Sequence, residues 1–270
     1  MKKIARRRTQ RIPRFWQSLW KRQRDFLDSG SKEFRHGASF VGVSKLAGQY
    51  YCEYKAENEF TLGRIETETK TSGTALHDEL IPSTEITARE FIQLVRRKEP
   101  SYAVLGVWGS VGGLKMVGTP DHIVWAGGRP LWLVELKTTG GDPEPLWRDQ
   151  ENQVRIYGLL LDLMGFDCTA LRLALARVRA RNMDDKEKMT WVQRISESLL
   201  SDKVPELEKR YAGRMKVHLL GHERAKAEAA VIEKAGYWLG RREATSSTSA
   251  AKCRACEYRL DCPKTLYGSV

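Results

Sequence analysis

The apolar and polar positions predict a helical beginning, a strand-rich middle and a helical end. Helical spacing marks residues 45–60 ("KLAGQYYCEYKAENEF"), with Ser44 as the expected N-cap, and further segments lie within 72–100. Ser83 or Thr84 is expected to cap the last of these segments.

Residues 102–138 gather aromatic and β-branched residues, broken by "GSVGG" and "AGGRP", which predicts an antiparallel meander. A helix is expected over 146–166 and a strand within 168–180. Charged helices are expected over 184–242, interrupted at Pro205. This order predicts a mixed α/β fold with one central sheet.

Within "VGTPDHIVWAGGRPLWLVELKTT" at 117–139, Asp121, Glu135 and Lys137 lie among the apolar residues of two expected strands, whereas Arg129 lies in the expected turn. Residues two apart on a strand share a face, so Glu135 and Lys137 point the same way. A turn at "AGGRP" brings Asp121 beside Glu135. Two neighbouring carboxylates can bind Mg²⁺ or Mn²⁺ through their oxygens. A lysine beside them can stabilise the negative charge on a phosphate during hydrolysis. The alternative is that these charges have no catalytic role and only mark the ends of two strands.

The net charge of +12 is concentrated at the N-terminus. Residues 1–24 hold ten Lys and Arg and no acid, which leaves 36 basic against 34 acidic residues in the remainder. We expect residues 1–32 to form a basic arm. It tracks nucleic-acid phosphates or packs on the body through Phe15, Trp16 and Trp20, and its acid-free, Arg-rich composition leaves a mitochondrial transit peptide as a third alternative.

No apolar run approaches the roughly 20 residues that cross a bilayer, and the basic arm lacks the apolar core of a secretory signal. We therefore expect a cytoplasmic protein that makes no use of a membrane.

"GTPDHIV" followed by "VELKTT" resembles the PD-(D/E)xK nuclease superfamily, specifically its RecB-like branch. "SGTALHDEL" places His77 where that branch carries a metal-ligating histidine, and "QVRIYGLLL" supplies its Gln153 and Tyr157 pair. The resemblance implies a restriction-endonuclease-like fold, a central mixed sheet flanked by helices.

The resemblance also implies roles for these residues. His77, Asp121 and Glu135 would hold Mg²⁺ or Mn²⁺, Lys137 would position the water, and Gln153 and Tyr157 would hold the scissile strand.

The cysteines form a second pattern. "CRACEYRLDCP" spaces Cys253, Cys256 and Cys262 as C-x2-C-x5-C, which indicates a metal or cluster site in a chain without a secretion signal. Cys52 supplies the fourth thiolate that a [4Fe–4S] cluster or a zinc ion ordinarily needs. Spacing alone does not choose between the two metals, and Cys168 is interpreted as a buried apolar residue.

The cysteine arrangement resembles the iron–sulfur RecB-like nucleases, including stand-alone CRISPR-associated adaptation nucleases. That resemblance implies a cluster joining the N- and C-terminal helical parts, a nuclease domain over 33–243, and a linker and cysteine segment over 244–270. It further implies 5′→3′ exonucleolytic trimming of single-stranded DNA ends, with CRISPR adaptation proteins as partners. A repair nuclease of the same branch and a non-catalytic DNA-binding subunit remain alternatives.

Overall fold

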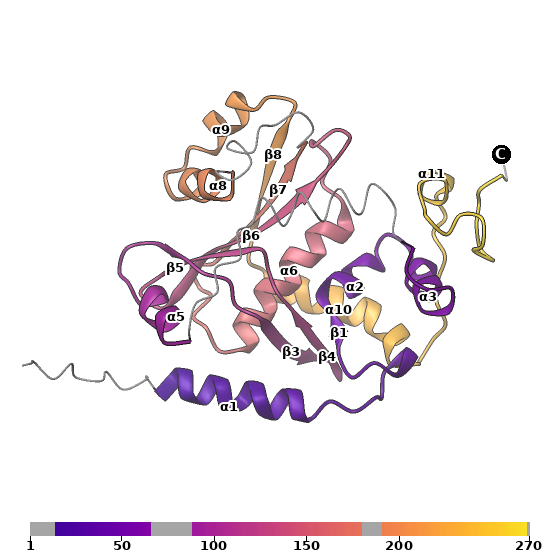
Figure 1. The fold of residues 1–270 in the computed structure, drawn as a ribbon, viewed down its shortest axis with the longest axis horizontal. Coiled ribbons are helices and arrows are strands. Elements are labelled where there is room, and N and C mark those ends of the chain that lie inside the picture. Colours follow the sequence, from indigo (N-terminus) through magenta and orange to yellow (C-terminus); the bar gives the residue numbers. More distant parts are fainter. Residues whose placement is uncertain (1–13, 66–87, 180–190, 269–270) are drawn as a thin grey trace, which may run out of the picture.

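The computed structural model describes residues 14–65, 88–179 and 191–268 (Figure 1). The N-terminal elements are α1 (Arg14–Asp28), η1 (Arg35–Gly37), β1 (Val41–Gly42), α2 (Val43–Gly48), α3 (Glu53–Thr61) and α5 (Ala88–Val95). The central elements are β2 (Ser101–Tyr102), β3 (Val107–Val111), β4 (Leu114–Gly118), β5 (His122–Ala126), β6 (Arg129–Thr138), α6 (Arg148–Leu163) and β7 (Arg172–Val178). The last are α8 (Trp191–Leu200), α9 (Val204–Arg210), β8 (Met215–Gly221), α10 (Arg224–Trp238) and α11 (Ala250–Arg254).

The strands of the described residues form two sheets. One has the order β2-β5-β6-β7-β8 and the other β1-β4-β3, and the β6–β7 and β1–β4 pairs are parallel whereas the others are antiparallel. The prediction of a single central sheet is therefore wrong, because the chain leaves one sheet at Gly118 and enters the other at His122. Pro120 lies between them and has no N–H to donate to a continuous ladder. The broader prediction of a mixed α/β fold flanked by helices is confirmed.

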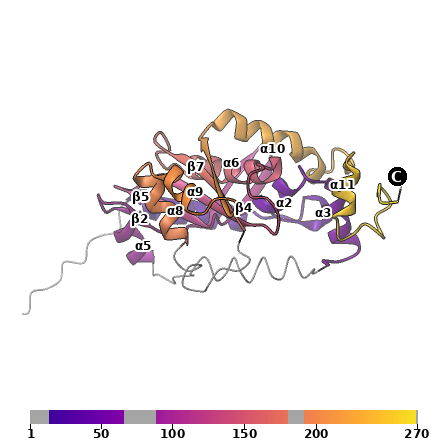
Figure 2. The same ribbon diagram turned by 90° about the horizontal axis from the view of Figure 1, so that it is seen from above.

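Apolar side chains cover both faces of the five-stranded sheet. Leu133 and Leu175 belong to the core that includes α6, whereas Val134 and Leu136 belong to a second core with Trp191 and the rest of α8 and α9. Figures 1 and 2 show α6 and α10 together, apart from α8 and α9. The alternation of faces along β6 therefore points Glu135 and Lys137 toward the α6 side.

The helix predicted over 45–60 is two helices. Helix α2 begins at Val43 with Gly42 as its N-cap, so Ser44 lies inside the helix and the predicted cap is wrong. The chain turns between the two helices, and the tyrosines there bond to different segments: the Tyr50 hydroxyl donates to the carbonyl of Ala230, and the Tyr51 hydroxyl donates to that of Lys252.

The helical prediction over 184–242 also needs correction. Residues Met215–Gly221 form the edge strand β8, in which Met215 and Val217 are buried in alternation. The break predicted at Pro205 is confirmed, since Pro205 lies in the first turn of α9. The helix predicted over 146–166 and the strand within 168–180 are confirmed as α6 and β7. The suggested caps Ser83 and Thr84 lie outside the described residues.

Helix α1 packs on the body. Trp16 and Leu19 are buried, and the Trp16 ring meets those of Phe91 and Phe166 at centroid distances of 5.5 and 5.6 Å. For residues 14–28, therefore, the aromatic side chains serve packing, as the second interpretation of the arm predicted.

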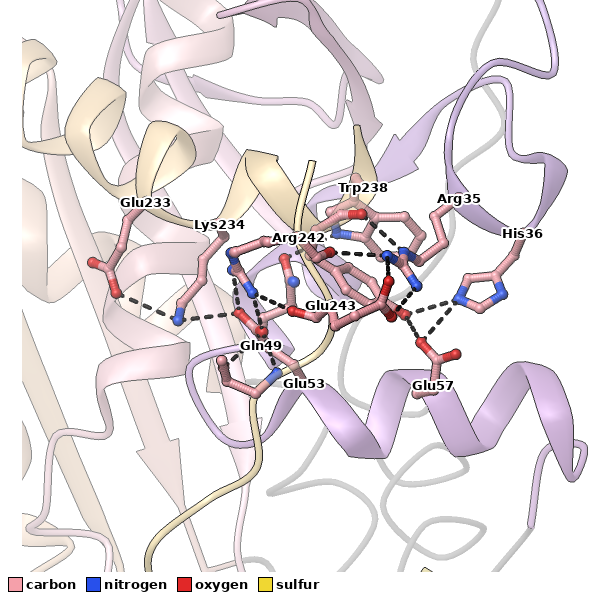
Figure 3. A network of polar contacts seen from close by, with 12 residues as sticks. Arg35, His36, Gln49, Glu53, Glu57, Glu233, Lys234, Trp238, Arg242 and Glu243 are labelled. Atoms are coloured by element: carbon pink, nitrogen blue, oxygen red, sulfur yellow. Dashed lines mark hydrogen bonds and ion pairs between the residues drawn. The ribbon is translucent and has the colours of Figure 1, made fainter. Parts of the chain in front are cut away.

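A buried ionic network fixes α3 to the end of α10 (Figure 3). The Glu53 carboxylate, 1% exposed, accepts hydrogen bonds from Arg242 at 2.5 and 2.7 Å and from the backbone and hydroxyl of Thr245 at 2.8 and 2.7 Å. Lys234 approaches it to 3.4 Å. Because Glu53 follows Cys52 directly, the network sets where Cys52 lies relative to the C-terminal segment.

In the three described ranges, no helix is both long and apolar enough to pass through a lipid bilayer.

Candidate active site

The β5–β6 hairpin brings the predicted carboxylates together. Its turn is at Gly127 and Gly128, whose φ angles of 58° and 84° are accessible to glycine at low cost. His122 pairs with Val134, so Asp121 reaches the strand at Glu135 and Leu136. The backbone N–H of Leu136 donates to Asp121 Oδ2 over 2.7 Å. The turn predicted at "AGGRP" is confirmed, together with the proximity that depends on it.

Glu135 and Lys137 share one face of β6, as the strand period predicts. Glu135 is 2% exposed, and Lys137 Nζ donates to Glu135 Oε1 over 2.8 Å. Burying a carboxylate is costly unless it is paired and hydrogen-bonded. The lysine supplies that pairing, and its side chain remains 27% exposed.

Helix α6 adds the two residues predicted to border the same cleft. Gln153 Nε2 donates to Glu135 Oε1 over 2.7 Å and lies 3.4 Å from the Tyr157 hydroxyl. The spacing of four residues places Gln153 and Tyr157 on one side of the helix. Gly118 makes room for this approach, since a Cβ at that position would lie 2.7 Å from Tyr157 Cε1.

The Glu135 carboxylate affects the protonation of two neighbouring side chains. Burial lowers the pKa of Lys137, but the Glu135 carboxylate more than offsets burial, so the net pKa of Lys137 is raised. Burial, and then the Glu135 carboxylate, raise the pKa of Tyr157. At neutral pH the site therefore presents a charged ammonium and a neutral phenol.

The donors present fit a hard divalent cation. Asp121 and Glu135 offer carboxylate oxygens, the ligand type that Mg²⁺ and Mn²⁺ prefer. Within the described ranges, no group of three or more His, Cys, Asp or Glu side chains is arranged to hold a metal ion. The predicted third ligand, His77, lies outside the described residues.

A family model describing the PD-(D/E)XK nuclease superfamily matches residues 43–263. The chain belongs to the PD-(D/E)XK nuclease superfamily. The match includes Asp121, Glu135, Lys137, Gln153 and Tyr157. Membership of this superfamily implies a nuclease that hydrolyses phosphodiester bonds with a divalent metal such as Mg²⁺ or Mn²⁺.

Two further comparisons add context. No curated protein matches this member of the PD-(D/E)XK superfamily. A solved structure described as "Crystal structure of SSO0001" is similar at a TM-score of 0.45 and 14% sequence identity, over 93% of this chain and 96% of that chain. The assignment to the superfamily rests on the family model.

This superfamily member places four of its separated cysteines around one pocket, although in the described ranges they do not form a group arranged to hold a metal ion. These four line the surface pocket between α3 and the segment around α11: Cys52, Cys253, Cys256 and Cys262. Figures 1 and 2 show α3 and α11 side by side. Cys168 lies elsewhere, in the core with α6, and burial raises its pKa to about 12.

Hydrogen bonds and an ion pair hold the cysteine segment on α3. Lys55 pairs with Glu257 at 3.2 Å, and the Tyr258 hydroxyl donates to the carbonyl of Gly63 over 2.8 Å. Burial is the main cause that raises the pKa of Cys256. A cation bound in the pocket would favour the thiolate instead.

Sequence reasoning missed two residues beside the site. The role of Gly118 was not predicted, because it consists only in leaving space for the Tyr157 ring, which comes from a distant helix. Arg177 was overlooked because it reaches the site through the parallel pairing of β6 with β7, in which it is the partner of Lys137. The alternation of "RLALARV" marks Arg177 as sharing a face with buried residues, which is the available sequence signal.

Proposed function

We propose that this protein is a metal-dependent deoxyribonuclease whose active site is built on Asp121, Glu135 and Lys137. The observation that carries the proposal is the close grouping of two carboxylates and a charged lysine at the end of the β5–β6 hairpin. The superfamily assignment supports the reaction class.

Asp121 and Glu135, with His77 and the carbonyl of Leu136, are the proposed ligands of the divalent ion. When bound, Mg²⁺ or Mn²⁺ supplies Lewis acidity and a more acidic water. The Lys137 ammonium orients the attacking water and stabilises negative charge that develops on the phosphate. Gln153 fixes the Glu135 carboxylate, and Gln153 and Tyr157 hold the scissile strand by hydrogen bonding.

We further propose 5′→3′ exonucleolytic action on single-stranded DNA ends or overhangs, and a role in CRISPR spacer acquisition with adaptation proteins as partners. This part of the proposal rests on the resemblance of the motifs and cysteine spacing to iron–sulfur RecB-like nucleases. The genes adjacent to the coding sequence test the pathway, since a repair nuclease would lack CRISPR neighbours.

The four pocket cysteines are the proposed ligands of a [4Fe–4S] cluster, with zinc as the competing occupant. Four thiolates are the ligand set common to both. Such a group would join position 52 to 253–262, and so stabilise the two ends of the nuclease body against separation.

The decisive experiment follows the products of single- and double-stranded DNA, labelled separately at the 5′ and 3′ ends, with Mg²⁺, Mn²⁺ or chelator. We expect metal-dependent shortening of single strands from the 5′ end. Asp121→Ala, Glu135→Ala and Lys137→Ala should each abolish cleavage while DNA binding persists. Glu206→Ala, which removes an exposed carboxylate on α9, should cut normally. A protein that binds DNA without any metal-dependent product would be a non-catalytic subunit.

A further inference from the structure

Trp147 stands apart from the other tryptophans of the chain. All eight lie in the described ranges; Trp147 is 46% exposed, whereas the other seven are buried or partly buried. It occupies the N-cap position of α6, next to Leu146, which is also exposed. Isolated exposed apolar residues are ordinary on a protein surface, so the exposure alone assigns no function.

A buried arginine lies under the indole. The Arg177 guanidinium carbon is 5.8 Å from the Trp147 ring centroid. Arg177 is buried, its Nη1 donates to the carbonyl of Pro145, and its Nε has no hydrogen-bond partner within 14–65, 88–179 and 191–268. Among the described residues, no carboxylate forms an ion pair with it. A guanidinium left in this state is costly to bury, which indicates a role beyond packing.

The pair lies next to the proposed catalytic residues. Arg177 and Lys137 are register partners on adjacent strands, so their Cα atoms are about 5 Å apart and their side chains share a face. Trp147 precedes Gln153 by six residues on the same helix, about 9 Å along its axis. A strand held at Gln153 therefore passes within reach of Trp147.

The charges around the pair favour a base over a phosphate. Burial lowers the pKa of Arg177, and the Asp142 and Asp149 carboxylates act on it in the opposite direction without outweighing burial. These carboxylates would repel a phosphate near the guanidinium, whereas a neutral base would meet an exposed aromatic face backed by a cation.

We propose that Trp147 is a stacking platform for one unpaired nucleobase beside the scissile phosphate, with Arg177 as the residue that positions the indole. This inference rests on the proposed nuclease function and deepens it, because it names the residue that binds an unpaired base of the single-stranded substrate. A base within a duplex has both faces already stacked and is not accessible to the indole.

The test measures binding of a poly(dT) oligonucleotide and of a duplex in the presence of chelator, so that no cleavage occurs. Trp147→Ala should weaken single-strand binding by about 5- to 100-fold, and Trp147→Phe should restore most of it. The slope of log affinity against log salt should not change, because stacking neutralises no phosphate. Tyr267→Ala, at 45% exposure in the C-terminal segment, is the matched control and should bind normally.

The role of Arg177 is tested by comparing the effect of its replacement with and without the Trp147 indole. Arg177→Gln should weaken single-strand binding, but in the Trp147→Ala background it should cause less than about a twofold further loss. Arg172→Gln, at the other end of β7, should have no effect in either background. A purely structural role for Arg177 would instead give equal losses in both backgrounds.

The inference is overturned if Trp147→Ala binds the single strand within twofold of the wild type, or if duplex binding falls equally. These outcomes are separate from failure of the nuclease proposal. If the nuclease proposal failed, the wild type would show no metal-dependent cleavage, while the effect of Trp147→Ala on binding would remain measurable.

Discussion

Gln153 on α6 and Glu135 on β6 are joined by a 2.7 Å hydrogen bond between a buried amide and a buried carboxylate. The two residues are 18 positions apart, and the bond ties the helix to the strand that precedes it in the chain. Since Lys137 donates to the same Oε1 atom, the amide and the ammonium together fix the orientation of this carboxylate.

Replacing Gln153 should impair cleavage more than folding. We expect Gln153→Ala to lower kcat/KM by about 10- to 100-fold, because a carboxylate displaced by about 1 Å no longer supports the productive geometry. The free energy of unfolding should fall by only about 1–2 kcal/mol, since Lys137 still pairs with Glu135.

Gln193→Ala is the matched control for this prediction. Gln193 donates to Glu197 over 2.7 Å on the exposed surface of α8, so the variant removes the same kind of bond away from the site. It should cut DNA at the wild-type rate. Equal kinetic effects of the two variants would contradict the role given to Gln153.

Replacing a pocket cysteine should reduce metal content. We expect Cys256→Ser, purified without oxygen, to lose bound iron or zinc and the visible absorbance of any cluster, and to melt at a lower temperature. Cys168→Ser should retain the metal, because Cys168 lies in the core away from the pocket. Elemental analysis and thermal melts check both variants, and unchanged metal in Cys256→Ser would rule out the ligand assignment.

Removing Glu53 should destabilise the protein strongly. Glu53→Ala leaves Arg242 without its buried partner and should cost about 3–5 kcal/mol of unfolding free energy, measured by denaturant titration. Glu243→Ala is the control: Glu243 pairs with Arg35, but its side chain is exposed, so the variant should resemble the wild type.

The same carboxylate should contribute to acid unfolding. Burial raises the pKa of Glu53, but hydrogen bonds from Arg242 and Thr245 outweigh burial and lower it to about 2, against an ordinary 4.5. Its contribution is therefore complete above pH 4.5 and is lost as the pH falls toward 2. Stability of the wild type should drop more steeply over this range than that of Glu53→Gln; parallel curves would contradict the assignment.

Helix α1 should contribute to stability through its buried face. We expect Trp16→Ala to lower the free energy of unfolding by about 3–5 kcal/mol, because it empties a site between Phe91 and Phe166. Gln17→Ala, on the exposed side of the same helix, should change it by less than about 0.5 kcal/mol. A small effect of Trp16→Ala would mean that α1 does not pack on the body in solution.

Local sequence patterns were sufficient to predict the short-range geometry of the active site. Strand alternation put Glu135 and Lys137 on one face, the two glycines of "AGGRP" fixed the turn that returns Asp121 to them, and helical spacing aligned Gln153 with Tyr157. Each of these relationships depends on backbone geometry within about thirty residues, which local residue types control.

The tertiary structure alone decided the long-range arrangement. The split into two sheets, the edge strand β8 and the place of Arg177 beside Lys137 all depend on which strands pair. Strand pairing is chosen by burial across the whole molecule, so no local pattern reports it. Likewise, Cys52 lines the same pocket as the C-terminal cysteines. The neighbouring Glu53 is bonded to Arg242, and that pairing is needed only once the carboxylate is removed from water.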